Sequence, residues 1–546
     1  MHHLQVIHSS RFTKNSNSQL TLSRIRRVKC DETRPVCERC VQAGRTCDGY
    51  ASATTSHQSR RALACAVRQL QVAGPASRVL GDPMPADDVA CFDFFRHCTS
   101  SMTASVLPAP FWERQVLQMA HAEKAVWNVV VTLGALHRRW EHSNSNSNSR
   151  MATALPTSHQ NQPPDAILRF THQATTHYYG AISLAKAIHD PVTLAVLSTA
   201  LAAAAHLAGR WAECQVHLHA GLRLLQSHRH HPTALGGLAQ SLERLELQAM
   251  FFQDARAPYV PFDLSPSSAW LGHIAEPASL HDAATVVFRL MRQFLLISNA
   301  AARGMLTLEG LDAAVAQLRQ DAQRWEVALE ALLPEGDPSH PTVLVLRLYH
   351  VMLQQLLAKG VIGPETRYDR CVGLFVEGVE LAEQILARST PSAMRFFMSL
   401  ELGVVVPLFL TVLRCRHPVV RRRALNMLGR MNRQEGIWNC EAAGRVAEQC
   451  IMLEEEGLGI QLPLRNGDGD AELRGLMAGI GEGPGIGDGE GFVPVWPDGW
   501  PSVPEEKRVL QTSVVVDVDA RVIEMTMHLT GGHGLGTPTR SVSIDI

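Results

Sequence analysis

Apolar residues recur three and four positions apart over most of residues 89–460. This spacing places them along one face of an α-helix, whereas the strict alternation of a β-strand is scarce in the same region. Gly and Pro interrupt the pattern at intervals that suit ordinary helices. The pattern therefore predicts an all-α domain over 89–460. Two polar stretches, 143–149 (SNSNSNS) and 158–164, are predicted to be loops within it.

The segment from Val192 to Leu225 predicts a pair of helices. Two apolar runs flank Gly209, Arg210 and Trp211, and a turn this short makes neighbouring helices antiparallel. Gly209 is expected to end the first helix, because glycine tolerates the left-handed conformation at that position. Trp211 is expected to pack the second helix against the first. The alanine-rich run 192–209 contains His206 and indicates a buried helix rather than a membrane span.

The regions outside this domain have a different character. Residues 1–23 are polar and show no pattern, and 51–88 form a linker with a short possible helix at 60–73. Residues 461–505 are rich in Gly and acidic residues and predict a flexible insertion. Alternation in 506–546 predicts a small β-hairpin, around residues 508–528 and turning at 517–520, followed by a tail whose last dozen residues are disordered.

Composition is that of a globular protein without an overall attraction for nucleic acid. Of the 546 residues 46% are hydrophobic and 19% charged, and the formal net charge is −1. Any DNA affinity must come from a local basic patch. The start of the chain lacks the apolar core of a signal peptide, and we expect no membrane partner. No H-E-x-x-H, G-x-S-x-G or P-loop motif occurs, so we do not expect an enzyme.

A compact chemical motif lies at residues 24–50. Four of the 12 cysteines follow one another at spacings of six, two and six residues, directly after a basic run. Thiolates at such spacing are suited to zinc, and metal binding would supply the folding free energy that so short a segment lacks. The candidate metal ligands are Cys30, Cys37, Cys40 and Cys47, and the basic residues before the first of them are Arg24, Arg26, Arg27 and Lys29.

Other candidate groups are better explained by ordinary structure. The eight remaining cysteines lie mostly in apolar, helix-like contexts and are expected to be free, buried thiols. His228, His230 and His231 lack a carboxylate or cysteine at helical spacing, so a metal site there is not favoured. The basic run 421–423 follows Pro418 at a helix start, and we expect it to form a solvated face.

The motif RIRRVKC, Pro35 and the closing GRTC resemble the DNA-binding domain of the fungal binuclear zinc cluster transcription factors. In that family six cysteines hold two zinc ions. This chain has only the last four, because Ser23 and Leu20 occupy the positions of the second and first ligands. The usual cluster cannot form, and at most one zinc ion is expected for the chain as written.

Three explanations of the missing pair remain open. The start of the chain, 1–23, is mis-assigned and replaces a segment with the two cysteines; or the chain is genuine and its DNA-binding module has degenerated; or the four remaining cysteines hold one zinc ion. A resemblance in the helical region favours the same family. Segments 126–140, 177–182, 211–225, 368–386 and 402–457 resemble the family's helical regulatory domain, which implies an all-α fold.

This resemblance implies a nuclear, sequence-specific regulator of RNA polymerase II genes. Arg26 and Arg27 would read the guanines of a CGG-type half-site, while Arg24 and Lys29 would lie near phosphates. Because one module reads about three base pairs, a second half-site is implied, with a homodimer or another transcription factor as partner. The alternative is a regulatory protein that has lost DNA binding together with its first two cysteines and acts through protein contacts.

Overall fold

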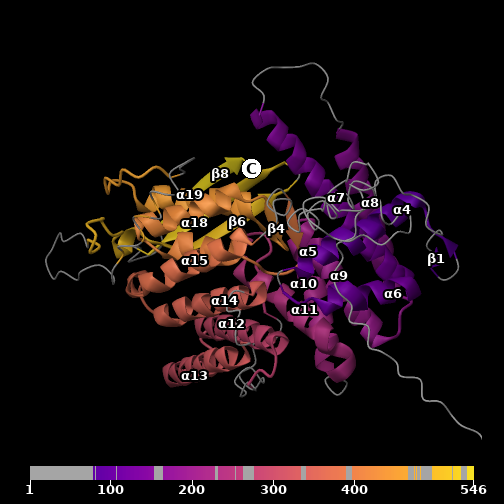
Figure 1. Cartoon of the computed structure of the whole chain (residues 1–546), viewed down its shortest axis with the longest axis horizontal. Coiled ribbons are helices and arrows are strands. Elements are labelled where there is room, and N and C mark those ends of the chain that lie inside the picture. Colours follow the sequence, from indigo (N-terminus) through magenta and orange to yellow (C-terminus); the bar gives the residue numbers. More distant parts are fainter. Residues whose placement is uncertain are drawn as a thin grey trace, which may run out of the picture. The chain divides into compact units, whose positions relative to one another are not determined.

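The structure is a computed structural model that describes residues 78–79, 82–105, 107–152, 164–227, 232–252, 254–261, 276–333, 340–388, 396–464, 473, 475, 477, 480, 495–518, 520–530 and 538–545. These residues belong to one compact unit, 76–546. Its helices confirm the predicted all-α character of the central region (Figure 1). Among the described helices none combines the length and apolarity needed to cross a membrane.

The first group of elements surrounds a hydrophobic core rich in aromatic and alanine side chains. A two-residue strand pair, β1 (Arg78–Val79) and β2 (Asp82–Pro83), precedes it within the region predicted as linker. The helices are α4 (Ala86–Phe94), η1 (Phe95–Thr99), α5 (Ser100–Ala104), η2 (Phe111–Gln115), α6 (Val116–Ala122), α7 (Lys124–Ala152), α8 (Pro164–Ala185), α9 (Pro191–Leu207), α10 (Trp211–Ser227) and α11 (Pro232–Phe251).

The pair α9 and α10 confirms the predicted helical hairpin. Asp190 caps α9 by accepting a hydrogen bond from the Thr193 amide at 2.8 Å, and Pro191 occupies the first turn. Gly209 ends it with φ of 70°, a left-handed value that glycine adopts without strain. The centre of α9 is buried on all sides, because its alanines let neighbouring helices approach closely.

Helix α7 contradicts one predicted loop. It continues to Ala152 through the SNSNSNS stretch, which the sequence pattern assigned to a connection. Ser and Asn disfavour helix by only a few tenths of a kcal/mol each, and no Gly or Pro is present to end the ladder of hydrogen bonds. The second predicted loop is consistent with the start of α8 at Pro164, while residues 153–163 lie outside the described part.

A second hydrophobic core lies among the later helices, the C-terminal strands and the end of α11. Its helices are α12 (Leu280–Ala302), α13 (Leu308–Leu332), α14 (Pro341–Lys359), η4 (Glu365–Cys371), α15 (Val372–Ala387), α17 (Val405–Arg414), α18 (Pro418–Arg430), α19 (Cys440–Glu454) and η5 (Glu505–Lys507). Side-chain caps start several of them: Ser279 for α12, Thr307 for α13 and Asn439 for α19.

A small sheet that the sequence pattern does not indicate joins the two cores. Strand β3 (Phe397–Ser399) pairs parallel to β4 (Arg433–Glu435), and β4 pairs antiparallel to β5 (Trp438–Asn439). Gly436 forms the turn with φ of 56°. The buried Glu435 carboxylate accepts hydrogen bonds from the amides of Gly403 and Val405 at 3.0 and 2.9 Å. It thereby satisfies buried amides at the start of α17 that have no partner within the helix.

The C-terminal sheet lies beside α18 and α19, drawn in yellow in Figure 1. Strands β6 (Val509–Asp517) and β7 (Val522–Leu529) form the predicted hairpin. The prediction of a disordered end was wrong, because β8 (Thr539–Asp545) pairs antiparallel with β7. The alternation of buried and exposed residues in β8 is weak, and its order comes from pairing with β7 rather than from its own apolar face.

Candidate functional site

The residues predicted to bind zinc and DNA lie outside the described residues. These are Cys30, Cys37, Cys40 and Cys47, with Arg24, Arg26, Arg27 and Lys29. His228, His230 and His231 and the possible helix at 60–73 also fall outside. Within the part of the chain that is described, no group of three His, Cys, Asp or Glu side chains is arranged to hold a metal ion.

The scattered cysteines of the described regions are free thiols, as predicted. Six of these seven are buried and Cys98 is half-buried. Burial raises the pKa of Cys214 well above its ordinary value and that of Cys450 to about 12. These thiols therefore stay protonated at neutral pH and are poor nucleophiles and poor metal ligands.

The basic run 421–423 is not the solvated face that the sequence suggested. Arg421, Arg422 and Arg423 are 0%, 2% and 4% exposed. Each guanidinium pairs with a carboxylate, of Glu454, Glu455 and Glu383 respectively. A solvated face was predicted because the run follows Pro418 at a helix start. Its partners come from α15 and the end of α19, far away in sequence.

Glu454 is the centre of this buried charge network. One of its oxygens, Oε1, accepts from Arg416 Nη2 at 3.0 Å and from the Val509 amide at 2.8 Å, while Oε2 accepts from Arg421 at 2.6 Å. Burial would raise the pKa of Glu454, but Arg416 and Arg421 together lower it below its ordinary value. The carboxylate is thus charged and fixes the first residue of β6 to the end of α19.

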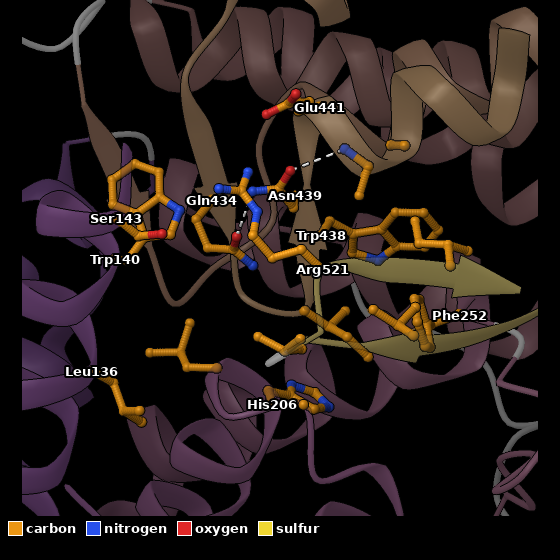
Figure 2. A pocket seen from close by; sticks show the side chains of 18 of the residues that line it. Leu136, Trp140, Ser143, His206, Phe252, Gln434, Trp438, Asn439, Glu441 and Arg521 are labelled. Atoms are coloured by element: carbon orange, nitrogen blue, oxygen red, sulfur yellow. Dashed lines mark hydrogen bonds between the residues drawn. The ribbon is translucent and has the colours of Figure 1, made fainter. Parts of the chain in front are cut away.

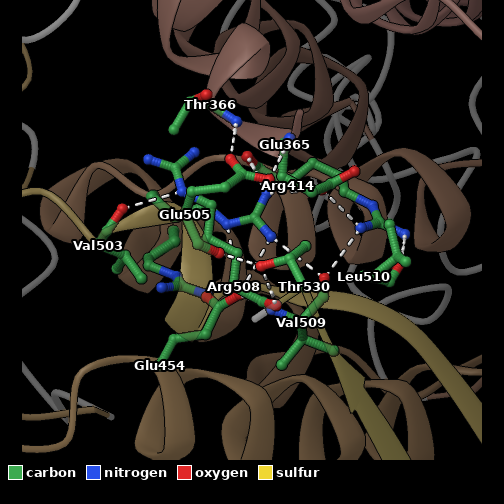
Figure 3. A network of polar contacts seen from close by, with 12 residues as sticks. Glu365, Thr366, Arg414, Glu454, Val503, Glu505, Arg508, Val509, Leu510 and Thr530 are labelled. Carbon is green, nitrogen blue, oxygen red and sulfur yellow. Dashed lines mark hydrogen bonds and ion pairs between the residues drawn. The ribbon is translucent and has the colours of Figure 1, made fainter. Parts of the chain in front are cut away.

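A second set of contacts, drawn in Figure 3, fixes the segment before β6 to the helices. Arg414 donates to Glu365 at 2.8 Å and to the Val509 carbonyl at 3.1 Å. Glu505 accepts from the amides of Glu365 and Thr366, at 2.9 and 2.8 Å, at the start of η4. The fully buried Arg508 pairs with both Asp369 oxygens, at 2.8 and 2.6 Å. The network therefore has a structural role, which is to fix the C-terminal sheet.

A cavity of about 700 Å³ lies where the two cores meet (Figure 2). Helices α7, α8, α9, α10, α11, α17 and α19 each contribute lining residues. The remaining walls come from the sheet β3–β5 and from strands β6 and β7. Most lining side chains are apolar, and four aromatic rings among them lie in contact: Trp211, Phe252, Phe409 and Trp438. Phe252 lies against Trp211 and Trp438, with ring centroids 4.9 and 5.7 Å apart.

Several polar groups line the same cavity. His206 is 2% exposed, and both its ring nitrogens are without a hydrogen-bond partner in the described part of the chain. The indole nitrogens of Trp140, Trp211 and Trp438 are buried and equally without a partner there. Burial lowers the pKa of His206 to about 3, so its ring is neutral at physiological pH. Buried donors without partners are rare in proteins.

Sequence reasoning missed this cavity as a site. It assigned the tryptophans to the core, and it mentioned His206 only to exclude a membrane span. One signal was available in the sequence, namely a histidine within a largely apolar run. Burying its ring nitrogens without hydrogen-bond partners costs free energy, so such a histidine is expected to have a partner. The walls, however, come from segments between residues 136 and 523, which no periodicity brings together.

Comparison with known proteins identifies two regions of the chain. Residues 24–56 match the fungal Zn(2)-Cys(6) binuclear cluster domain, and residues 90–256 match the fungal specific transcription factor domain. The second match spans α4 to α11, and the resemblance noted at 402–457 lies beyond it. Neither domain is an enzyme domain, and both belong to transcription regulators.

Two curated relatives agree with these matches. The aspercryptin biosynthesis cluster-specific transcription regulator atnN of Emericella nidulans is 22% identical over 556 aligned residues, covering 80% of this chain and 87% of the relative. The transcription regulator lscL of Purpureocillium lilacinum is 36% identical over 125 residues, covering 22% of this chain and 29% of the relative. No solved structure matches the chain significantly.

Proposed function

We propose that this chain, which has the domain composition of the fungal zinc-cluster transcription regulators, acts in the nucleus as a zinc-dependent, sequence-specific DNA-binding protein. It would read CGG-type half-sites in the promoters of RNA polymerase II genes. The observation that carries the proposal is the match of residues 24–56 to the zinc-cluster domain, joined to a helical region that matches the regulatory domain of the same proteins.

The chemistry of the basic run supports DNA as the partner. Residues 24–48 contain seven basic and four acidic side chains, whereas the whole chain has a net charge of −1. Arg26 and Arg27 would each present a guanidinium fork to the O6 and N7 atoms of a guanine, which discriminates by about 1–3 kcal/mol per contact. Arg24 and Lys29 would add phosphate contacts that salt weakens. A second half-site, read by a second copy or another regulator, would supply the remaining specificity.

The second basic run does not compete with this assignment. The three arginines at 421–423 are buried in ion pairs, so they offer no surface to a phosphate backbone. Of the two basic runs, the proposal of DNA binding therefore depends on the one at residues 24–29.

The zinc content of the chain is the part of the proposal that an experiment can measure directly. With Cys30, Cys37, Cys40 and Cys47 as ligands, the module would hold at most one zinc ion, whereas an intact family cluster holds two. The alternative function is a regulator that does not bind DNA. It keeps the helical region, lacks a working module and acts by association with other proteins.

The test uses the purified full chain. Metal analysis gives the zinc content, and fluorescence anisotropy gives affinity for a duplex with paired CGG triplets at about 50 and 200 mM salt, between which phosphate-dependent binding falls steeply. We expect zinc to be present, binding to weaken with salt, and Arg26→Ala/Arg27→Ala to abolish preference for CGG. The control Arg60→Ala/Arg61→Ala removes equal charge from the linker and should bind as the parent does. Zinc-free protein without salt-sensitive binding would establish the alternative.

A further inference from the structure

The cavity between the two cores combines apolar walls with buried hydrogen-bond donors. Its volume of about 700 Å³ is within the range of sites for small organic molecules, about 300–1,000 Å³. The side chains that form it belong to both hydrophobic cores and to the C-terminal hairpin. A molecule in the cavity would therefore touch both hydrophobic cores and the C-terminal hairpin.

The donors determine what kind of molecule fits. The indole nitrogens of Trp140, Trp211 and Trp438 can only donate a hydrogen bond, so they require acceptor atoms opposite. Neutral His206 offers one donor and one acceptor. Figure 2 shows Trp140 and Trp438 on different sides of the cavity, with His206 on a third. An occupant with oxygens at two or three separate positions would meet these groups.

Charge excludes one class of occupant. Glu441 is the one carboxylate among the described lining residues; its oxygen accepts from Arg445 at 2.9 Å, and its side chain is 46% exposed. The guanidinium groups of Arg139 and Arg521 also line the cavity. With two guanidinium groups against one carboxylate, the lining disfavours a cationic amine. An acidic or neutral oxygen-bearing molecule would find complementary charge.

We infer that this cavity binds an oxygenated, largely apolar small molecule, neutral or with a single acidic group, stacked among the aromatic walls. The acceptor oxygens of the ligand take the hydrogen bonds of His206 and the three tryptophans. Because Trp438 belongs to the β3–β5 sheet and Trp140 to α7, the ligand stabilises the junction of the two cores. The inference does not depend on DNA reading by residues 24–50, since its site lies wholly within residues 136–523.

Two probes test the inference on the purified full chain. The fluorescent anion 1-anilinonaphthalene-8-sulfonate has an aromatic body and acceptor oxygens, and we expect saturable binding of one molecule per chain. The flavanone naringenin should displace it and raise the melting temperature, whereas the cationic amphiphile dodecylamine should do neither. Equal displacement by the amine, or binding that does not saturate, would overturn the inferred ligand chemistry.

Matched variants locate the probe. Trp438→Phe keeps the ring and removes one donor, and should weaken binding about fivefold, as expected for one lost hydrogen bond. Trp496→Phe is the control, since its indole nitrogen is also buried without a partner in the described part but lies outside the lining. Val516→Trp should fill the cavity and abolish binding, whereas Val515→Trp, on the opposite face of β6, should not.

Circular dichroism and melting temperature establish that each variant is folded. The comparison of Trp438→Phe with Trp496→Phe tests the location of the probe even if the larger substitutions in β6 prevent folding. Unchanged affinity in Trp438→Phe, or an equal loss in both tryptophan variants, would show that the probe binds elsewhere and would refute the site.

Discussion

Arg421 and Glu454 form an ion pair from which solvent is fully excluded, with Arg421 Nη2 donating to Glu454 Oε2 at 2.6 Å. Arg416 donates to the other oxygen of the same carboxylate. Charges this deep are tolerated only when each is paired and hydrogen-bonded. The pairing also explains why a run of three arginines can lie inside a helical domain.

Removing the charge of Glu454 should destabilise the domain strongly. Glu454→Gln keeps the shape but removes the charge that Arg416 and Arg421 share, leaving Arg416 with Glu365 at 3.1 Å and Arg421 with Glu455 at 3.5 Å. We expect a loss of about 3–5 kcal/mol in the free energy of unfolding, the usual cost of breaking a buried ion pair. Urea denaturation followed by circular dichroism measures it. Glu456→Gln is the control, because Glu456 is exposed and its ion pair with Arg540 spans 3.8 Å; it should change stability by less than about 1 kcal/mol.

Stability should fall in mild acid because of two buried histidines. Burial lowers the pKa of both His137 and His206 to about 3, whereas an unfolded histidine titrates near 6.5. Their neutral forms are therefore favoured in the fold, and this contribution, complete above about pH 6.5, decreases as pH falls towards 3. Each histidine contributes a slope of up to about 1.4 kcal/mol per pH unit within that window.

Glu141 acts in the opposite direction, since burial raises the pKa of this carboxyl to about 7 and its protonation favours the fold as pH falls. A variant isolates the histidine term. The denaturant midpoint of His206→Leu should depend less on pH than that of the parent between pH 6 and 5. Parallel pH profiles of the two proteins would mean that His206 has the same pKa in the folded and unfolded states, and would contradict its neutral burial.

Gly134 should be intolerant of any side chain. It lies in α7 where the helix crosses α4, and a Cβ built there would be 2.0 Å from the Cys91 carbonyl oxygen. Backbone cannot rotate away as a side chain does, so Gly134→Ala should separate the helices and cost about 1–3 kcal/mol or more. Gly373 in α15 has open space around it, and Gly373→Ala should instead stabilise by about 0.5–1 kcal/mol. Thermal melts of both variants distinguish packing from helix propensity.

The turn between α9 and α10 offers a third comparison. Gly209 and Gly304 have almost equal φ, 70° and 68°, but a Cβ at Gly209 would lie 2.6 Å from Val518 Cγ2 while Gly304 has nothing nearby. Both alanine variants should lose about 1–2 kcal/mol through the left-handed backbone. Gly209→Ala should lose more, and the added substitution Val518→Ala should restore only that excess. An equal loss of stability in both single variants would show that Val518 moves aside at no cost in free energy.

Local patterns were sufficient to predict the helical character of the central region and the end of α9 at Gly209. The α9–α10 hairpin followed from Gly209 between two apolar runs, and the pairing of β6 with β7 followed from alternation around residues 517–520. These features depend on neighbours in sequence, where periodicity and turn chemistry act directly. The resemblance of residues 24–50 to a zinc-cluster module was recognised from the cysteine spacing together with RIRRVKC, Pro35 and GRTC, and residues 24–56 match that domain.

Features that depend on distant partners could not be predicted. The burial of Arg421 requires Glu454, and the order of β8 requires β7 beside it. Helix α7 continues through a Ser/Asn repeat, although that composition is typical of loops. The cavity is the extreme case, since it forms where helices and strands between residues 136 and 523 converge.

The attachment of β6 to Glu454 and Arg414 makes the C-terminal hairpin necessary to the helices that precede it in sequence. A nonsense or frameshift mutation ahead of residue 505 would remove Arg508, Val509 and the hairpin, and would leave the carboxylates of Asp369 and Glu454 short of partners. Such a truncated product would keep its amino-terminal module yet carry an unsatisfied interior, and cellular quality control would degrade it. The fold thereby makes synthesis through the hairpin a condition for the protein to accumulate.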